Sequence, residues 1–378
     1  MPERIYLDNA ATTTLDPEVL QAMLPYMTDF YGNPSSIHAQ GRKTKSAIEM
    51  ARKSIASLLG TSPGEIFFTS CGTEADNMAL IKSVEILGIK HIISANLEHH
   101  AVLHTLDYLK ERFGIKVTFL NNNPQGEIDL NQLESLLQDS EHTMVSLMHG
   151  NNEIGNLLDI NQVAEMCAAH KVLFHSDTVQ TMGHHIFDLK NSPIDFIVGS
   201  AHKFHGPKGT GFIYINAKNR LHPLIHGGAQ ERDMRGGTEN LYGIVGMAKA
   251  LELAYQNFEE DKKHIIGLKQ YLKDALVSQI PGVSFNGLSG DPDKSLYTVL
   301  NVSFPPHPDN EMILFKLDIE GISCSGGSAC ASGTNLGSHV LNALEIPEDR
   351  ANVRFSFSKF TTTAELDKTI ASLVQIFG

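Results

Sequence analysis

Short apolar runs alternate with segments of helical periodicity through the first part of the chain. Seven of these runs are long enough to form buried strands. They span residues 65–70, 91–95, 116–120, 143–149, 172–176, 195–199 and 211–215. Helical spacing falls between them, at about residues 73–87, 102–113, 129–137 and 159–170. Strands that alternate with helices form βαβ units, so we expect an α/β fold with a seven-stranded, mostly parallel sheet.

Local signals refine this pattern at two places. Only residues 200–210 connect the last two strands, which is too short for a crossover helix. We therefore expect those two strands to be antiparallel if they pair. Near the N-terminus, Asp16-Pro17-Glu18 has the order of an N-cap acid, a proline at the first helical position and a first-turn acid. A helix should begin there, followed by a second helix at about residues 42–59.

The pattern changes after residue 215. An irregular stretch leads into a long helical segment at about 243–278. Short strand-like runs and helical segments then alternate without a regular order, which is an α+β pattern. We expect a large domain of residues 15–255 and a smaller α+β domain that contains residues 256–378. The N-terminal residues 1–14 precede the first regular unit, and we assign them to the smaller domain.

Composition and charge argue against several classes of protein, including nucleic-acid-binding and membrane-spanning proteins. The chain has 378 residues, 42% of them hydrophobic, with a formal net charge of −13. This charge argues against nucleic acid or an acidic membrane as a partner. No apolar run approaches the roughly 18 residues of a membrane span, and no signal peptide is visible. The four cysteines form no CxxC pair and no HExxH motif occurs, so we expect a cytoplasmic protein without a metal site.

Polar residues at two strand ends point to one cofactor. Lys203 follows the strand at 195–199, where glycines and a proline end regular structure. Asp177 and Gln180 follow the strand at 172–176. Pyridoxal phosphate needs an amine for its covalent attachment and an acid for its pyridine nitrogen. A solvated surface lysine is the alternative interpretation of Lys203, and its neighbours argue against it.

A phosphate site is expected where residues 69–77, TSCGTEADN, join a strand to a helix. Gly72 permits a tight turn and Thr73 supplies a hydroxyl at the helix start. Backbone N–H groups and the helix dipole attract anions there. Ser200 and His202 could complete the same cup. The segment is not GxGxxG, so a dinucleotide is less favoured.

Three further residues are candidates for the reaction itself. His99 follows the strand at 91–95 and could stack on a pyridine ring or transfer a proton, unless it is an ordinary surface histidine. Asn152 follows another strand and could bind a ring oxygen or a substrate carboxylate. Arg354 lies among apolar residues in a predicted strand, where it is either a carboxylate clamp or half of an ion pair.

Cys330 is the candidate nucleophile among the cysteines. It lies in residues 323–335, where nearly every side chain is small, so we predict a mobile loop. An accessible thiol on such a loop suits nucleophilic chemistry. Cys324 is expected in the core, and Cys71 and Cys167 are expected to pack against other side chains.

Together these segments resemble the cysteine desulfurases, class-V enzymes with the fold-type I architecture of pyridoxal phosphate enzymes. The resemblance covers almost the whole chain, and its motifs occur in the family's order. They are YLDNAATT, GNPSSIH, FTSCGTEADN, LEHHAV, HGNNEIG, HSDTVQ, SAHKFHGPKG, HGGAQERDMRGGT, SGGSACAS and VRFSFSKF. The chain departs from the family pattern at Cys71 and Ala201, where glycine is usual. The SGGSAC form resembles the group whose long loop reaches acceptor proteins.

The resemblance implies a role for each candidate residue. Lys203 would hold pyridoxal phosphate, His99 would stack on its ring, and Cys330 would receive sulfur as a persulfide. Cys330 could also ligate an iron–sulfur cluster transiently. The cofactor's other contacts would come from Gly72, Thr73, Asn152, Asp177, Gln180, Ser200, His202 and, across a homodimer interface, Thr238. Asn152 and Arg354 would bind the carboxylate of L-cysteine.

The implied activity is conversion of L-cysteine to L-alanine, with sulfur passed to an acceptor or scaffold protein. The sulfur would supply iron–sulfur clusters or tRNA thiolation. A selenocysteine lyase and an aminotransferase of the same fold are the enzymatic alternatives. A non-catalytic sulfur carrier is a third, which the presence of Lys203, Asp177 and Cys330 argues against.

Overall fold

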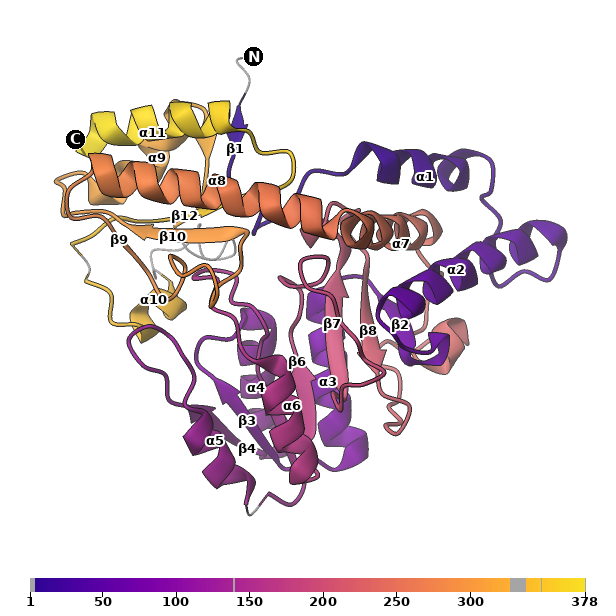
Figure 1. The fold of residues 1–378 in the computed structure, drawn as a ribbon. Helices are drawn as coiled ribbons and strands as arrows, with labels where there is room; N and C mark the ends of the chain where they lie inside the picture. The colour runs from indigo at the N-terminus through magenta and orange to yellow at the C-terminus, as the bar shows by residue number, and fades with distance from the viewer. Residues whose placement is uncertain (1–3, 139, 327–337, 348, 378) are drawn as a thin grey trace.

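The computed structural model describes residues 4–138, 140–326, 338–347 and 349–377. A seven-stranded sheet forms its centre, with strand order β2-β8-β7-β6-β5-β3-β4 (Figure 1). All seven expected strands are confirmed: β2 (Ile66–Thr69), β3 (His91–Ala95), β4 (Lys116–Leu120), β5 (Thr143–Ser146), β6 (Leu173–Ser176), β7 (Phe196–Ser200) and β8 (Gly211–Ile215). β8 runs antiparallel to both its neighbours, as the short connection from β7 requires, and the other pairings are parallel.

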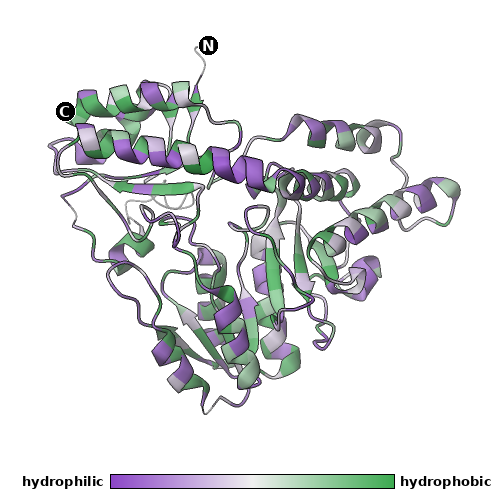
Figure 2. Ribbon diagram, in the orientation of Figure 1, coloured by the Kyte–Doolittle hydropathy of each residue, from purple (hydrophilic) through white to green (hydrophobic). Residues whose placement is uncertain are grey.

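Successive residues of these strands supply two different hydrophobic cores, because side chains alternate between the two faces of a sheet. Ile92 and Ile93 of β3, for example, belong to opposite cores. The helices α3 (Gly72–Leu87) and α4 (His100–Phe113) close one core. The other core contains residues of α1 (Pro17–Thr28), α2 (Ala39–Leu58), α5 (Leu130–Leu137), α6 (Ile160–Ala169) and α7 (Leu241–Gln256). Figure 2 shows mostly hydrophobic strands and helices of mixed hydropathy, as this layering demands.

The C-terminal part has its own core and its own antiparallel sheet, β12-β10-β9. Its strands are β9 (Ser284–Phe285), β10 (Val299–Ser303), β11 (Ile322–Ser323) and β12 (Asn352–Ser356). Its helices are α8 (Phe258–Gln279), α9 (Ile313–Ile319), α10 (His339–Ala343) and α11 (Thr363–Phe377). The N-terminal strand β1 (Ile5–Tyr6) pairs in parallel with β11, so the start of the chain lies with this part.

The prediction of one long helix at 243–278 is wrong in one respect, because Asn257 divides this segment into two helices, α7 and α8. The two halves have different environments: α7 packs in the core of the large sheet and α8 in the C-terminal core. A single apolar periodicity cannot reveal such a break. The domain limits given above remain a prediction, and the break lies two residues from the proposed boundary at 255. Within the described ranges, no helix is both long and apolar enough to cross a membrane.

Candidate active site

A cavity of about 210 Å³ opens at the C-terminal ends of the parallel strands. It brings together every residue expected to bind cofactor or substrate, with the exception of Thr238 and Cys330. Its lining consists of Ala10, Ala11, Cys71, Gly72, Thr73, Asp76, His99, Met148, Asn152, Asp177, Val179, Gln180, Ser200, His202, Lys203 and Arg354. These residues are far apart in the sequence, and the ends of neighbouring parallel strands are what bring many of them together.

Lys203 stands on the single 3₁₀ turn η2 (Ala201–Lys203) that follows β7. Its Nζ donates to the carbonyl oxygens of Ala10 and Ala11, at 2.5 and 3.0 Å. The N-terminal segment therefore forms part of the cavity wall. No local pattern in the sequence points to Ala10 and Ala11 as part of this site, although the small residues of YLDNAATT permit their close approach to Lys203. Ala201 is buried in the core.

Asp177 follows β6 and is only 6% exposed. One carboxyl oxygen accepts the Val179 N–H at 2.9 Å, which fixes the side chain beside the cavity. Burial raises the pKa of Asp177, while His99, the Val179 N–H and Lys203 act in the opposite direction. Gln180 lies one turn further on and donates to the Ala10 carbonyl at 3.0 Å.

The start of α3 is the part of the cavity that suits an anion. Asp16, Asp129 and Asp159 cap α1, α5 and α6, whereas Cys71 makes no side-chain cap on α3. The first N–H groups of a helix lack partners within the helix, so those at Gly72 and Thr73 suit a phosphate. A Cβ on Gly72 would lie 2.6 Å from Val179 Cγ2, so only glycine fits there. Ser200 and His202 line the same cavity.

Two half-buried cavity histidines are neutral at neutral pH, because partial desolvation disfavours their charged forms. His99 caps α4 by accepting the Ala101 N–H on Nδ1 at 3.1 Å, which assigns the ring proton to Nε2. Burial lowers the pKa of His99, with an opposing contribution from Asp177. Burial also lowers the pKa of His202 to about 4, assisted by the charges of Lys203 and Lys208.

Arg354 shows features of both interpretations made from the sequence. It is 1% exposed on β12, where its neighbours Val353 and Phe355 point into the C-terminal core. Strand alternation turns Arg354 the other way, toward the cavity. Its guanidinium donates to Asp8 Oδ1 at 2.9 Å and to the Asn152 carbonyl at 2.7 Å. Its Nε is buried and has no hydrogen-bond partner among the described residues. A guanidinium has five N–H groups, so the two hydrogen bonds to Asp8 and Asn152 leave donors for a ligand.

Two predicted residues are not in this cavity. Thr238 lines a separate cavity of about 180 Å³ with Glu231, Arg235 and Asn240. Cys330 lies outside the described residues. Of the other cysteines, Cys324 packs against the C-terminal core, and burial raises its pKa to about 12.

The remaining two cysteines were both expected to be packing residues. Cys167 is buried in the core, as expected. Cys71 departs from that expectation, because it lines the cavity at the start of α3.

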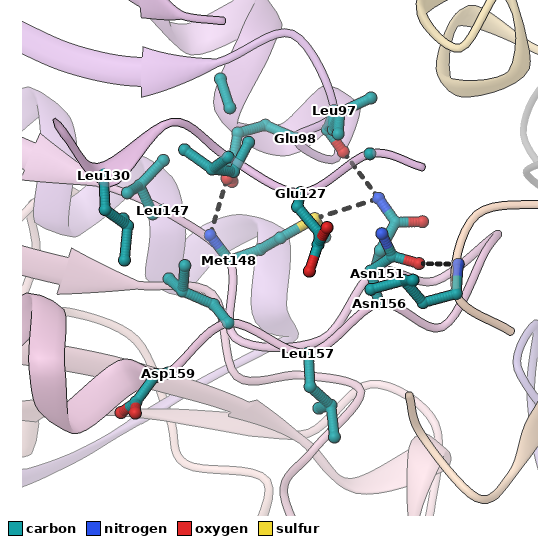
Figure 3. A pocket seen from close by; sticks show the side chains of 15 residues that line it. Leu97, Glu98, Glu127, Leu130, Leu147, Met148, Asn151, Asn156, Leu157 and Asp159 are labelled. Atoms are coloured by element: carbon teal, nitrogen blue, oxygen red, sulfur yellow. Dashed lines mark hydrogen bonds between the residues drawn. The ribbon is translucent and has the colours of Figure 1, made fainter. Parts of the chain in front are cut away.

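Figure 3 shows the lining of a second cavity, of about 190 Å³. Met148 lines both cavities. Leucines dominate the wall of the second cavity, and its amides already have partners within the protein. Asn151 donates to the Leu97 carbonyl at 2.9 Å, and Asn156 donates to the Gln125 carbonyl at 2.7 Å. The first cavity has the amine, the acid and the uncapped helix start together, so we assign the chemistry to it. Within the described residues, no acid, cysteine and histidine cluster could hold a metal ion.

Comparison with known proteins agrees with the geometry. The class-V aminotransferase family matches residues 5–369. A cysteine desulfurase IscS of Dictyoglomus turgidum is 40% identical, covering 100% of this chain and 95% of that protein. The chain belongs to the cysteine desulfurase family. The cysteine desulfurase IscS of Methanosarcina thermophila is 41% identical, covering 98% and 91% of the two chains.

Solved structures place this cysteine desulfurase among the fold-type I enzymes. A NifS-like protein superposes with a TM-score of 0.90 at 36% identity, over 99% of both chains. A structure described as SspA in complex with cysteine has a TM-score of 0.82 at 32% identity, over 95% of this chain and 100% of the other. The α/β fold expected from the sequence is thereby confirmed.

Proposed function

We propose that this cysteine desulfurase binds pyridoxal phosphate between Lys203, Asp177 and the start of α3, and converts L-cysteine to L-alanine. The observation that carries the proposal is the presence of an amine, a buried carboxyl group and an uncapped helix N-terminus in one cavity. Each matches one part of the cofactor: the aldehyde, the pyridine nitrogen and the phosphate. When bound, the cofactor withdraws electrons from the substrate Cα.

The side chains around the cavity would then bind the substrate and transfer its protons. Arg354 lines the cavity and has N–H groups beyond the two that bind Asp8 and Asn152, so it would bind the substrate carboxylate and keep its ion pair with Asp8. Lys203 Nζ would take the proton from the substrate Cα. His99 carries its proton on Nε2 and would exchange it with the substrate sulfur. Asn152 would assist in holding the carboxylate.

Cys330 would complete the reaction as the sulfur acceptor. Its thiolate attacks the substrate sulfur, the bond between that sulfur and Cβ breaks, and the carbon skeleton takes up protons to leave as L-alanine. The sulfur remains on Cys330 as a persulfide. We propose transfer from there to an acceptor or scaffold protein that supplies iron–sulfur clusters or thiolated tRNA.

The proposal includes a homodimer in a reducing, cytoplasmic setting. Thr238 lies in a cavity apart from Lys203, which supports a role at the phosphate of the partner's site. The three cysteines among the described residues are free thiols, as expected in the cytoplasm.

A product assay with L-cysteine tests the function. Purified protein with a reductant should release equal amounts of L-alanine and sulfide. Lys203→Ala should abolish both products together with the visible absorbance of the cofactor. Cys330→Ala should abolish the persulfide and retain that absorbance, while Cys324→Ala, the matched control, should retain both.

Two outcomes would replace the proposal. Release of a keto acid with an unreacted thiol, and full turnover in Cys330→Ala, would indicate an aminotransferase. A strong preference for selenocysteine over cysteine would indicate a selenocysteine lyase.

A further inference from the structure

A second buried acid lies beside Asp177 and has no part in the function described so far. Asp76 is on α3, one turn after Gly72, and its side chain lines the same cavity. His175 is on β6, two residues before Asp177, and therefore on the same face of the sheet. Asp76 is 1% exposed and His175 is fully buried. Their atoms Oδ1 and Nε2 are 3.3 Å apart.

Neither of these two atoms has a hydrogen-bond partner elsewhere in the described part of the chain. The other ring nitrogen of His175, Nδ1, lies 2.9 Å from Ser146 Oγ on the neighbouring strand β5. Buried polar atoms without partners are strongly unfavourable. A proton on the Asp76 carboxyl, donated to His175 Nε2, would satisfy both atoms and allow Nδ1–H to donate to Ser146.

The surrounding charges favour the same protonation state. Two other buried carboxyl groups act on Asp76: Asp177 after β6, and Glu98 in the loop before α4. Burial raises the pKa of Asp76 well above its usual value, and the charges of Asp177, Glu98 and Cys71 add to the effect. Burial raises the pKa of Glu98 as well. Burial lowers the pKa of His175 to about 3, so the imidazole is neutral and can accept the proton.

We propose that Asp76 is a positioning residue: a neutral carboxylic acid that donates its proton to His175 and leaves Asp177 as the ionised group that meets the cofactor nitrogen. The inference depends on the proposed cofactor site, since the role of Asp177 is defined by that ring. The physical reason for a neutral Asp76 is the repulsion that two ionised carboxyl groups, Asp76 and Asp177, would exert on each other. A carboxylate at Asp76 would oppose the ionised form of Asp177, whereas a neutral acid keeps the contact between Asp76 on α3 and His175 on β6 without adding charge.

Infrared spectroscopy of the holoenzyme tests the protonation state directly. A buried carboxylic acid has a carbonyl band that a carboxylate lacks, and Asp76→Asn should remove one such band from the wild-type spectrum at neutral pH. The same variant should leave the pH midpoint of the cofactor absorbance unmoved, because a neutral amide replaces a neutral acid. Asp177→Asn is the control, and it should shift that midpoint by about one pH unit or more.

Unchanged carbonyl bands together with a shifted absorbance midpoint in Asp76→Asn would overturn the proposal of a neutral Asp76. If Asp76 is ionised, Asp76→Asn leaves the carbonyl bands unchanged and shifts the absorbance midpoint by about one pH unit, because a charge is lost beside Asp177. His175→Gln gives a second measurement if Asp76→Asn fails to fold. It replaces the nitrogen acceptor with an oxygen, so the Asp76 band should change frequency, and an unchanged band contradicts the shared proton.

These results are separable from failure of the proposed function. The carbonyl band is a property of the protein and can be measured whether or not L-cysteine reacts. If the wild-type protein had no desulfurase activity, the proposed function would be wrong. The infrared spectrum would still test whether Asp76 carries the proton.

Discussion

Burial sets the acid–base properties of the individual side chains around the cavity. It raises the pKa of Asp177 and lowers the pKa of His99 and of His202. Neutral imidazoles therefore lie beside the amine of Lys203 at neutral pH, and His99, Lys203 and the Val179 N–H oppose the effect of burial on the pKa of Asp177. Such a site can accept a proton from a substrate without first releasing one to water.

Replacement of Arg354 by lysine should raise the KM for L-cysteine. A lysine keeps the charge but loses the planar guanidinium that contacts Asp8 and Asn152 at once. Loss of a charge-assisted hydrogen bond predicts a fall in kcat/KM of about tenfold to a hundredfold. Steady-state kinetics with L-cysteine as substrate would measure KM and kcat/KM for both proteins.

Arg350→Lys is the matched control for that measurement. Arg350 contacts Ser303 and the Gly282 carbonyl rather than the cavity, so its variant should have the wild-type KM. An unchanged KM in Arg354→Lys would show that Arg354 serves only its ion pair with Asp8.

At the scale of elements, the ends of strands and the starts of helices produce the site. β6 and β7 are parallel neighbours, so Asp177 and the turn that carries Lys203 emerge at the same edge of the sheet. On the adjoining helix, α3, the first turn has no side-chain cap and faces the same edge. An ordinary Asp or Ser cap at Cys71 would occupy the N–H groups that the proposed phosphate site needs.

Gly72→Ala should weaken cofactor binding while the fold is retained. The added methyl group would overlap Val179 and displace the first turn of α3 from the cavity. We expect the dissociation constant of pyridoxal phosphate to rise by about tenfold, equivalent to about 1.4 kcal/mol. Titration of the apoprotein with pyridoxal phosphate, monitored by absorbance, would measure this dissociation constant.

Gly267→Ala provides the comparison for this variant. Gly267 lies within α8 with nothing within 4 Å of an added Cβ. Alanine should raise the unfolding free energy there by about 0.5–1 kcal/mol, without an effect on the cofactor. Equal cofactor affinity in Gly72→Ala and the wild type would contradict the role assigned to the start of α3.

At the scale of the whole molecule, the cavity depends on segments from both ends of the chain. The N-terminal carbonyls of Ala10 and Ala11 hold Lys203, and Asp8 holds Arg354 of β12. Further out, Lys359 forms an ion pair with Asp16, the cap of α1, at 2.6 Å. The C-terminal part and the large sheet therefore contribute to one site.

Mixed dimers should show that Thr238 serves the partner's site. Lys203→Ala and Thr238→Asp should each be inactive as homodimers. A mixed dimer would carry both changes in one site and neither in the other, so mixing the two variants should restore activity. Lack of restoration, with mixed dimers detected by differential tags, would contradict the shared site.

Buried histidines should make the whole protein less stable in acid. His149 and His184 have pKa values lowered by burial to about 3 and about 4, whereas an unfolded histidine titrates near 6.5. Below about pH 6.5 the unfolded chain binds more protons, so stability falls as the pH falls toward these lowered values. The slope is about 1.4 kcal/mol per pH unit for each histidine.

Urea denaturation at several pH values measures this slope. His149→Asn should make it shallower, because one buried imidazole is removed. His222→Asn is the control, since His222 is exposed and its removal should leave the slope unchanged. Equal slopes in the wild type and His149→Asn would contradict this account.

The sequence by itself determined the elements and most of the chemistry. Short, continuous apolar runs predicted all seven strands of the large sheet, because a strand that is buried on both faces needs apolar side chains on both. Strand ends followed by Lys203 and by Asp177 predicted a shared edge. These are local properties, which a linear sequence records directly.

Only the tertiary structure decided which distant groups complete the site. Asp8 and Arg354 are 346 residues apart, and no local pattern pairs them. The same holds for the carbonyls that hold Lys203, for the contact of Asp76 with His175, and for the break at Asn257. Their positions follow from tertiary packing, which sums many weak contacts that no short segment contains.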